Sequence, residues 1–151
     1  MSVTPPVDQA LVFATAAEGL NRRFGDRLPP ALFDELRSIG FDLHAPAPAY
    51  PLELWDRVLR RIVQSLYPEL PLEAQLRTAG REYIGGFVET ALGRGALIAA
   101  RVLGPKRTLL RMNRNLQNAG NYIQCDGVAS GENEVALVAA MRPPYLPHWA
   151  G

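Results

Sequence analysis

A clear pattern of apolar and polar positions lies between residues 52 and 66. Leu54, Val58 and Ile62 recur every four residues, and arginines lie among the positions between them. This spacing places the apolar side chains along one side of a helix, which is typical of a helix that packs on a core. We therefore predict a core-facing amphipathic helix that begins at residue 52.

Two shorter helical patterns precede this segment. They predict helices over about 14–24 and from 30 to 39, each followed by a glycine, as is common at helix ends. Residues 44–51 hold three prolines and predict an irregular spacer, because proline lacks the backbone N–H donor. Residues 1–13 are expected to be frayed or disordered, so that a single domain covers 14–151.

Glycines mark the next helical stretch, which runs from Leu72 to about Val102. Each glycine inside a helix costs about 1 kcal/mol relative to alanine, so several of them indicate a gain elsewhere. Three small residues, Gly86, Thr90 and Gly93, fall at i, i+4 and i+7 on one side of the predicted helix. This track would let a backbone approach closely, from a neighbouring helix, a second subunit or a ligand. We include it among the candidate partner contacts.

A row of basic side chains distinguishes the helix predicted from Gly104-Pro105 to Gly120, whose buried stripe would be Leu109, Met112 and Leu116. No acid occurs between Arg94 and Asp126. The row can bind phosphates, acidic protein surfaces or a carboxylate ligand, or it can be a solvated face that pairs with Glu73, Glu82 or Glu89. Its members lie at i, i+4, i+7 and i+11 on one face: Arg107, Arg111, Arg114 and Asn118.

Two strands are predicted near the end of the chain, over 122–128 and 134–141, with a turn between them. The fold class is therefore α+β, with four to five helices packed on a small C-terminal antiparallel sheet. The second strand is apolar on both alternating faces and expects cover on both. Because a lone hairpin is marginal in water, the sheet is expected to be incomplete. A missing C-terminal portion, a second subunit or another protein could complete it.

Composition is that of a globular protein, with 151 residues, 48% hydrophobic and 21% charged. The formal charge of +1 disfavours nucleic-acid binding as a main function, because a dedicated binder is usually basic. The longest apolar runs fall far short of the roughly 20 residues that cross a bilayer, and the N-terminus lacks a secretory pattern. We expect a cytoplasmic protein that does not bind membranes.

Residues for catalysis are sparse. Cys125 is the single cysteine, and the histidines are His44 and His148, so a Ser-His-Asp arrangement or a histidine-rich metal site lacks parts. The glycines near residue 86 lie within a helical pattern rather than after a strand, unlike a phosphate-binding loop. We expect no enzyme activity, no metal and no cofactor.

Four segments carry a resemblance to a known family: EGLNRRFG, YPLELWDRVLRR, GREYIGGFVETALGR and GPKRTLLRMNRNLQNAGNY. Together they resemble the Myxococcus-expanded paralogous family, a myxobacterial domain of unknown function. The resemblance implies a cytoplasmic bacterial protein and transfers no catalytic residue. Members of that family usually continue past PPYLPHWAG with a further helix and strand, which implies that the sheet here is incomplete. The arrangement is also faintly similar to the haem-NO-binding and 4-vinyl-reductase domains.

These features favour a non-enzymatic regulatory or adaptor domain that binds a partner protein or itself, as a homodimer for example. The arginine row and the track from Gly86 to Gly93 are the expected contact surfaces. The alternative is a small-molecule sensor that holds a hydrophobic ligand, or haem, in an apolar pocket. The residues expected to line that pocket are Trp55, Tyr83, Phe87 and Met112.

Overall fold

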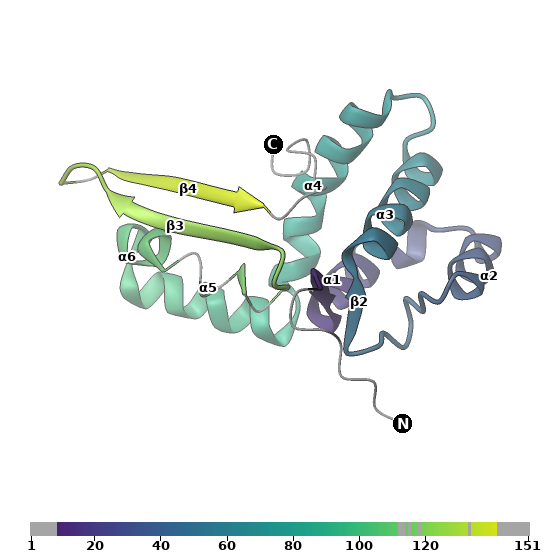
Figure 1. The fold of residues 1–151 in the computed structure, drawn as a ribbon, viewed down its shortest axis with the longest axis horizontal. Helices are drawn as coiled ribbons and strands as arrows, with labels where there is room; N and C mark the ends of the chain where they lie inside the picture. The colour runs from purple at the N-terminus through teal and green to yellow at the C-terminus, as the bar shows by residue number, and fades with distance from the viewer. Residues whose placement is uncertain (1–8, 112–113, 115, 118, 133, 142–151) are drawn as a thin grey trace.

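The structure, a computed structural model, describes residues 9–141 except 112–113, 115, 118 and 133. It is an α+β fold in two parts, a helical body and a long arm that extends from it (Figure 1). The body covers residues 9–88, and the arm covers 91–141 and carries the C-terminal β-hairpin. The fold class predicted from the sequence is confirmed.

The body contains most of the helices, and the three predicted over 14–24, 30–39 and from 52 are present. Its elements are β1 (Leu11–Phe13), α1 (Ala14–Phe24), the 3₁₀ turn η1 (Gly25–Arg27), α2 (Pro30–Ser38), β2 (Ala49–Pro51), α3 (Leu52–Leu66) and α4 (Leu72–Val88).

The N-terminal segment is more ordered than expected from the sequence. Residues 1–8 lie outside the described part, but Leu11–Phe13 form β1, which pairs antiparallel with β2. The expectations of a frayed segment up to residue 13 and of an irregular spacer up to 51 were therefore wrong at these strands. Each strand has only three residues, too few to show a period, but Val12 is fully buried and opposite Tyr50.

The buried residues of the hydrophobic core lie within the body, and Tyr122 of the arm packs against them. The buried cluster runs from Val12 to Ala79, and among the described residues of the arm only Cys125 is a buried apolar side chain. The stripe predicted on α3 faces this cluster. The largest side chains that are almost fully buried are Phe24, Phe41, Leu20, Leu36, Leu43, Leu52 and Ile62.

The single helix predicted over 72–102 was wrong, because the chain breaks it at Thr90. This residue has extended backbone angles and is the N-cap of α5 (Ala91–Leu103). Its hydroxyl oxygen accepts the Gly93 N–H at 3.0 Å and donates to the Phe87 carbonyl at 2.7 Å. Threonine is a preferred N-cap residue because its side chain satisfies an otherwise unpaired N–H of the first turn. The preference of threonine for the N-cap position therefore outweighs the helical periodicity from which a single helix was predicted.

The arm consists of α5, α6 (Pro105–Leu110) and a hairpin of β3 (Ile123–Ala129) and β4 (Val135–Met141). The predicted strands are confirmed, and their register pairs Ile123 with Met141 and Ala129 with Val135. The predicted helix beyond residue 110 is interrupted, because α6 ends at Leu110. The chain must turn there to bring Ala119 back to β1, where the Phe13 N–H donates to the Ala119 carbonyl at 2.9 Å.

Asn121 fastens the arm to the body at this point. Its backbone N–H donates to the Leu11 carbonyl at 3.0 Å, and its side-chain oxygen accepts the Leu11 N–H at 2.7 Å. Its side-chain amide also donates to the Gln9 carbonyl at 3.1 Å. With the bridge between Val12 and Gly120, these bonds make β1 a middle strand between β2 and the arm.

Glycine is required where α1 and α4 cross. A Cβ on Gly86 would lie 2.3 Å from the Gly19 carbonyl oxygen and 2.6 Å from the Arg23 Cβ, which no ordinary packing allows. A Cβ on Gly85 would meet no atom within 4 Å. The cost of glycine in α4 is therefore offset at Gly86 by close helix packing within the chain.

We predict that Gly86→Ala destabilises the protein by about 1–3 kcal/mol, because the added methyl group forces α1 and α4 apart. The matched change Gly85→Ala should stabilise it by about 0.5–1 kcal/mol through helix propensity. Urea unfolding followed by circular dichroism measures both. Equal effects of the two substitutions would show that α1 and α4 do not cross at Gly86.

Candidate functional site

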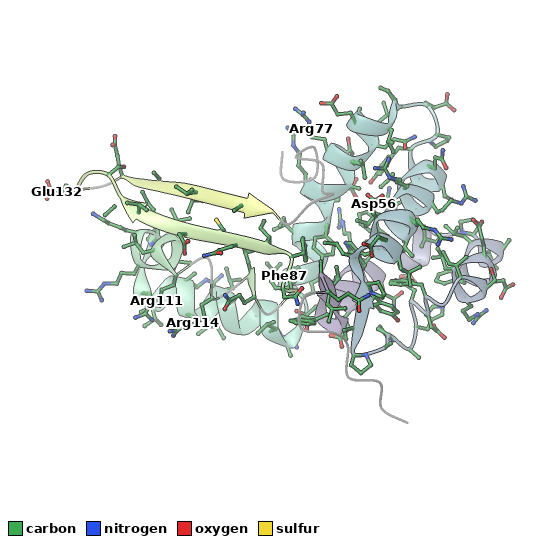
Figure 2. The ribbon with its side chains drawn as sticks, viewed as in Figure 1. Asp56, Arg77, Phe87, Arg111, Arg114 and Glu132 are labelled. Carbon is green, nitrogen blue, oxygen red and sulfur yellow. The ribbon has the colours of Figure 1, made fainter. Side chains whose placement is uncertain are left out.

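The arginines of the predicted row lie on the arm. Arg107, Arg111 and Arg114 are all exposed, and in the described part of the chain none of them forms an ion pair. Figure 2 shows Arg111 and Arg114 beside α6, on the side of the arm away from β4. We call Arg107, Arg111 and Arg114 the arginine surface. Their charges are open to an external anionic group.

The structure bears on the interpretation of this row as a solvated face that pairs with nearby acids. Two of the three acids that could have neutralised it are paired elsewhere, since Glu82 binds Arg23 and Arg27, and Glu73 binds Arg77. Glu89 forms no ion pair among the described residues. The interpretation of the row as a face paired with Glu73 or Glu82 was therefore wrong.

The row is not one straight helical line. Arg107 is on α6 and Arg111 follows its last residue, while Arg114 lies in a separate helical position. Asn118 and Met112 lie outside the described residues. Lys106, which belongs to the same basic stretch but not to the predicted row, holds the hairpin turn to α6, because its Nζ donates to the Gly131 carbonyl at 2.8 Å.

The small-residue track lies inside the chain's own packing. Gly86 contacts α1, Thr90 caps α5, and Gly93 is buried against the Phe87 carbonyl. All three are buried. Of the explanations left open by the sequence, packing within the subunit is the one that the structure shows.

Exposed apolar side chains on α5 and on the hairpin are a feature of the arm that the predicted site residues do not include. On α5, Ile98 is 62% exposed and Val102 is 80% exposed. On the hairpin, Val128 is 53% and Val138 is 60% exposed. Ile98 and Val102 lie one turn apart on α5, and contiguous exposed apolar groups of this kind are typical of binding surfaces. The available signal was the ALIAARVL stretch, which is apolar around most of the helix and so cannot be covered by one neighbour.

The hairpin is covered on one face only, and chiefly over β3. Cys125 on β3 is 5% exposed, and Gly127 lies so close to α6 that a Cβ would be 2.4 Å from the Leu109 carbonyl oxygen. On β4, Leu137 faces the same way as these two residues but remains exposed. In the described part of the chain, β4 therefore lacks the packing on both faces that its apolar sequence predicts.

The aromatic residues proposed to line a ligand pocket do not meet in one cavity. Trp55 is buried in the core, with its ring centroid 6.0 Å from that of Phe41. Tyr83 donates its hydroxyl to the Ala16 carbonyl at 3.0 Å and lines a cavity of about 10 Å³ that neither Trp55 nor Phe87 lines. Burial raises the pKa of Tyr83. Such a cavity holds about one water molecule, whereas drug-sized ligands occupy about 300–1,000 Å³.

Polar groups converge most densely at Glu82. One carboxylate oxygen accepts the Tyr67 hydroxyl at 2.7 Å, and the other accepts Arg27 at 2.7 Å and Arg23 at 3.2 Å. The hydrogen bond from Tyr67, followed by that from Arg27, lowers the pKa of Glu82 below its usual 4.5. A lowered pKa suits an ion pair rather than a general acid at neutral pH. This cluster ties α1, η1, the end of α3 and α4 together.

We predict that Glu82→Gln lowers the free energy of unfolding at pH 7 by about 1–2 kcal/mol, a modest cost because solvent screens the half-exposed arginines. The folded-state pKa is below the unfolded value, so this contribution is present above about pH 4.5 and is lost as pH falls through the folded pKa. Denaturant titrations of both proteins between pH 7 and 3 should converge at the acid end. The control Glu18→Gln changes an exposed acid without an ion pair in the described chain. If Glu82→Gln were as neutral as this control, the cluster would not stabilise the fold.

Hollows also lie on the surface of the described part of the chain. One of about 590 Å³ is lined by His44, Asp26 and Glu89, and His44 stacks on Phe33 with a centroid distance of 4.5 Å. Another, about 430 Å³, lies between α2 and α3 and contains the Glu35–Arg61 ion pair.

Within the described ranges, no three histidine, cysteine or acidic residues are placed to hold a metal ion. His148 lies outside those ranges.

None of the helices in the described residues has the length and apolar character that crossing a bilayer requires.

Fold and surface together define an α+β domain with a closed helical core and an arm that exposes apolar and cationic groups. The chain belongs to the family described as protein of unknown function (DUF2378), whose profile matches residues 10–148. Comparisons with curated proteins and with solved structures found no match.

Proposed function

We propose that this chain is a non-enzymatic association module, with a regulatory or adaptor role, whose body is a scaffold and whose arm binds protein. The observation that carries the proposal is the unequal distribution of exposed apolar residues. Among the large apolar residues of the described chain that are exposed, seven lie on the arm, between residues 97 and 138, and three, Leu70, Leu72 and Ile84, lie on the body.

Burial of these side chains is the free-energy source for association. Removal of apolar surface from water contributes about 25 cal/mol per Å², so a large valine or isoleucine left exposed is unfavourable by about 1.5–3 kcal/mol relative to burial. Ile98 and Val102 lie one turn apart on α5, where one partner element could cover both.

The arginine surface supports a partner with acidic groups. Arginine presents a rigid fork of N–H donors that binds a carboxylate through two hydrogen bonds. Because Arg107, Arg111 and Arg114 form no ion pair in the described chain, they remain able to make such contacts. The charges would steer an acidic partner, and the apolar residues of the arm would hold it.

The proposal also includes the cellular compartment of the protein and a finer family assignment. A cytoplasmic setting is supported by the single cysteine of the sequence, since disulfide-rich proteins are typical of oxidising compartments. The motifs quoted above support a finer assignment, the Myxococcus-expanded paralogous family. The cavity of about 10 Å³ gives the sensor alternative no support.

We predict that Arg107→Gln, Arg111→Gln and Arg114→Gln together leave thermal unfolding unchanged and weaken partner capture at least about tenfold, since each charged contact contributes roughly 0.5–1 kcal/mol. A pull-down from native lysate, quantified by mass spectrometry, measures the capture. The melting temperature by circular dichroism verifies that the variant is folded.

The matched control removes the same charge from the body by changing Arg22, Arg57 and Arg81 to glutamine. These arginines are exposed and also lack ion pairs in the described residues. The control should retain capture. Equal loss in both triple variants would mean that net charge, and not the arginine surface, governs binding, and unchanged capture by the arm variant would contradict the proposed site.

A further inference from the structure

The outer edge of β4 is a second binding feature of the arm, apart from the arginine surface. Within the described chain, β4 pairs with β3 on one side and with no strand on the other. Along an antiparallel strand, every second residue directs its N–H and C=O groups to the same edge. An open edge therefore offers a row of hydrogen-bonding groups to another strand.

This edge lacks the usual protection against such pairing. Proteins blunt edge strands with charged side chains, prolines, bulges or very short strands. Residues 135–141 read VALVAAM and contain neither a charge nor a proline. The register with β3 is continuous over seven pairs, without a bulge.

Both faces of β4 are also accessible. Leu137 and Ala139 are exposed on the face toward α6, and Val138 and Ala140 are exposed on the opposite face. In Figure 1, α5 and α6 lie along β3, and β4 is the strand farther from them. The helices of the arm thus leave room beside β4 for a further strand.

We propose that this edge pairs with β4 of a second copy of the chain, antiparallel across a two-fold axis, so that two hairpins form one four-stranded sheet. The inference rests on the proposed function, that the arm is an association surface, and names one partner for it. A two-fold axis at Val138, the central residue of β4, would place each strand opposite itself over its full length.

Charge favours a copy of the same strand over a charged partner. β4 carries no charge, so the new ladder would contain no like-charged pair and would give an acidic peptide nothing to bind. Asp126, the acid opposite Val138, is on β3, three strand spacings or about 14 Å from its symmetry mate. That distance exceeds the screening length of about 8 Å at physiological ionic strength. Arg111 and Arg114 lie on the side of the arm away from β4 (Figure 2).

Sedimentation velocity of the full chain across a concentration series tests the inference. The wild type should pass from monomer to dimer, and Val138→Lys should raise the dimer dissociation constant at least about tenfold, because two lysines would meet at the two-fold axis. The hairpin itself should tolerate this change, since residue 138 faces Asp126 across the β3–β4 ladder. The control Val128→Lys places the same charge on the same face but on the inner strand, and should dimerise like the wild type.

Three outcomes would overturn the inference. A wild type that stays monomeric at about 100 µM has no such contact of micromolar affinity. A ladder of larger species indicates a head-to-tail contact instead of a two-fold one. Equal loss in Val138→Lys and Val128→Lys indicates packing through the face of the sheet. None of these results affects partner capture through the arginine surface, so failure here is distinguishable from failure of the proposed function.

Hydrogen exchange of the wild type tests whether the β4 edges pair, even if Val138→Lys does not fold. Amides of β4 should exchange more slowly as the protein concentration rises through the dimerisation range, while those of α5 should not change. Exchange of β4 that is independent of concentration would contradict edge pairing.

Discussion

Strand β1 holds the molecule together, because it is shared by the body and the arm. It pairs with β2 on one side and meets residues 119–121 on the other. There the Asn121 side chain forms hydrogen bonds with the backbone of Gln9 and Leu11, as the backbone of a neighbouring strand would. The start of the described chain is thus joined to a segment more than a hundred residues later. The arm keeps its position through these hydrogen bonds, through the short connection from α4 to α5 at Thr90, and through Tyr122, which packs against the core of the body.

The division of apolar surface follows from this arrangement. α1, α2, α3 and α4 close around one cluster between Val12 and Ala79, and the crossing of α1 and α4 is tight enough to require Gly86. α5, α6 and β3 cover one another only in part, and β4 is left exposed on both faces. The body is therefore self-sufficient, whereas the arm retains apolar area whose burial would be favourable.

Electrostatics separates the same two parts. In the body, arginines are matched to acids across elements, as in the Arg27–Glu82 and Arg61–Glu35 pairs, and Arg61 holds the pKa of Glu35 below its usual value. In the arm, six basic residues between 91 and 141 outnumber three acids, and Arg107, Arg111 and Arg114 have no ion pair in the described chain. Apolar exposure and uncompensated positive charge thus coincide on one part of the molecule, which is the physical basis for its proposed association.

The sequence by itself determined the helices at 14–24, 30–38 and 52–66, the β-hairpin and the exposed arginines, because each depends on local periodicity, turn residues or charge. Only the tertiary structure decided that Thr90 divides a glycine-rich helix and that β1 is a buried strand. It also decided that Gly86 faces α1 and that Glu82 pairs with Arg23 and Arg27 of the body rather than with an arginine of the arm. These features depend on which distant segments meet: a three-residue strand has no period to read, and an ion pair between residues 27 and 82 leaves no local pattern. The bare edge of β4 was expected from its composition, but its accessibility on both faces depends on where α5 and α6 stop covering the sheet.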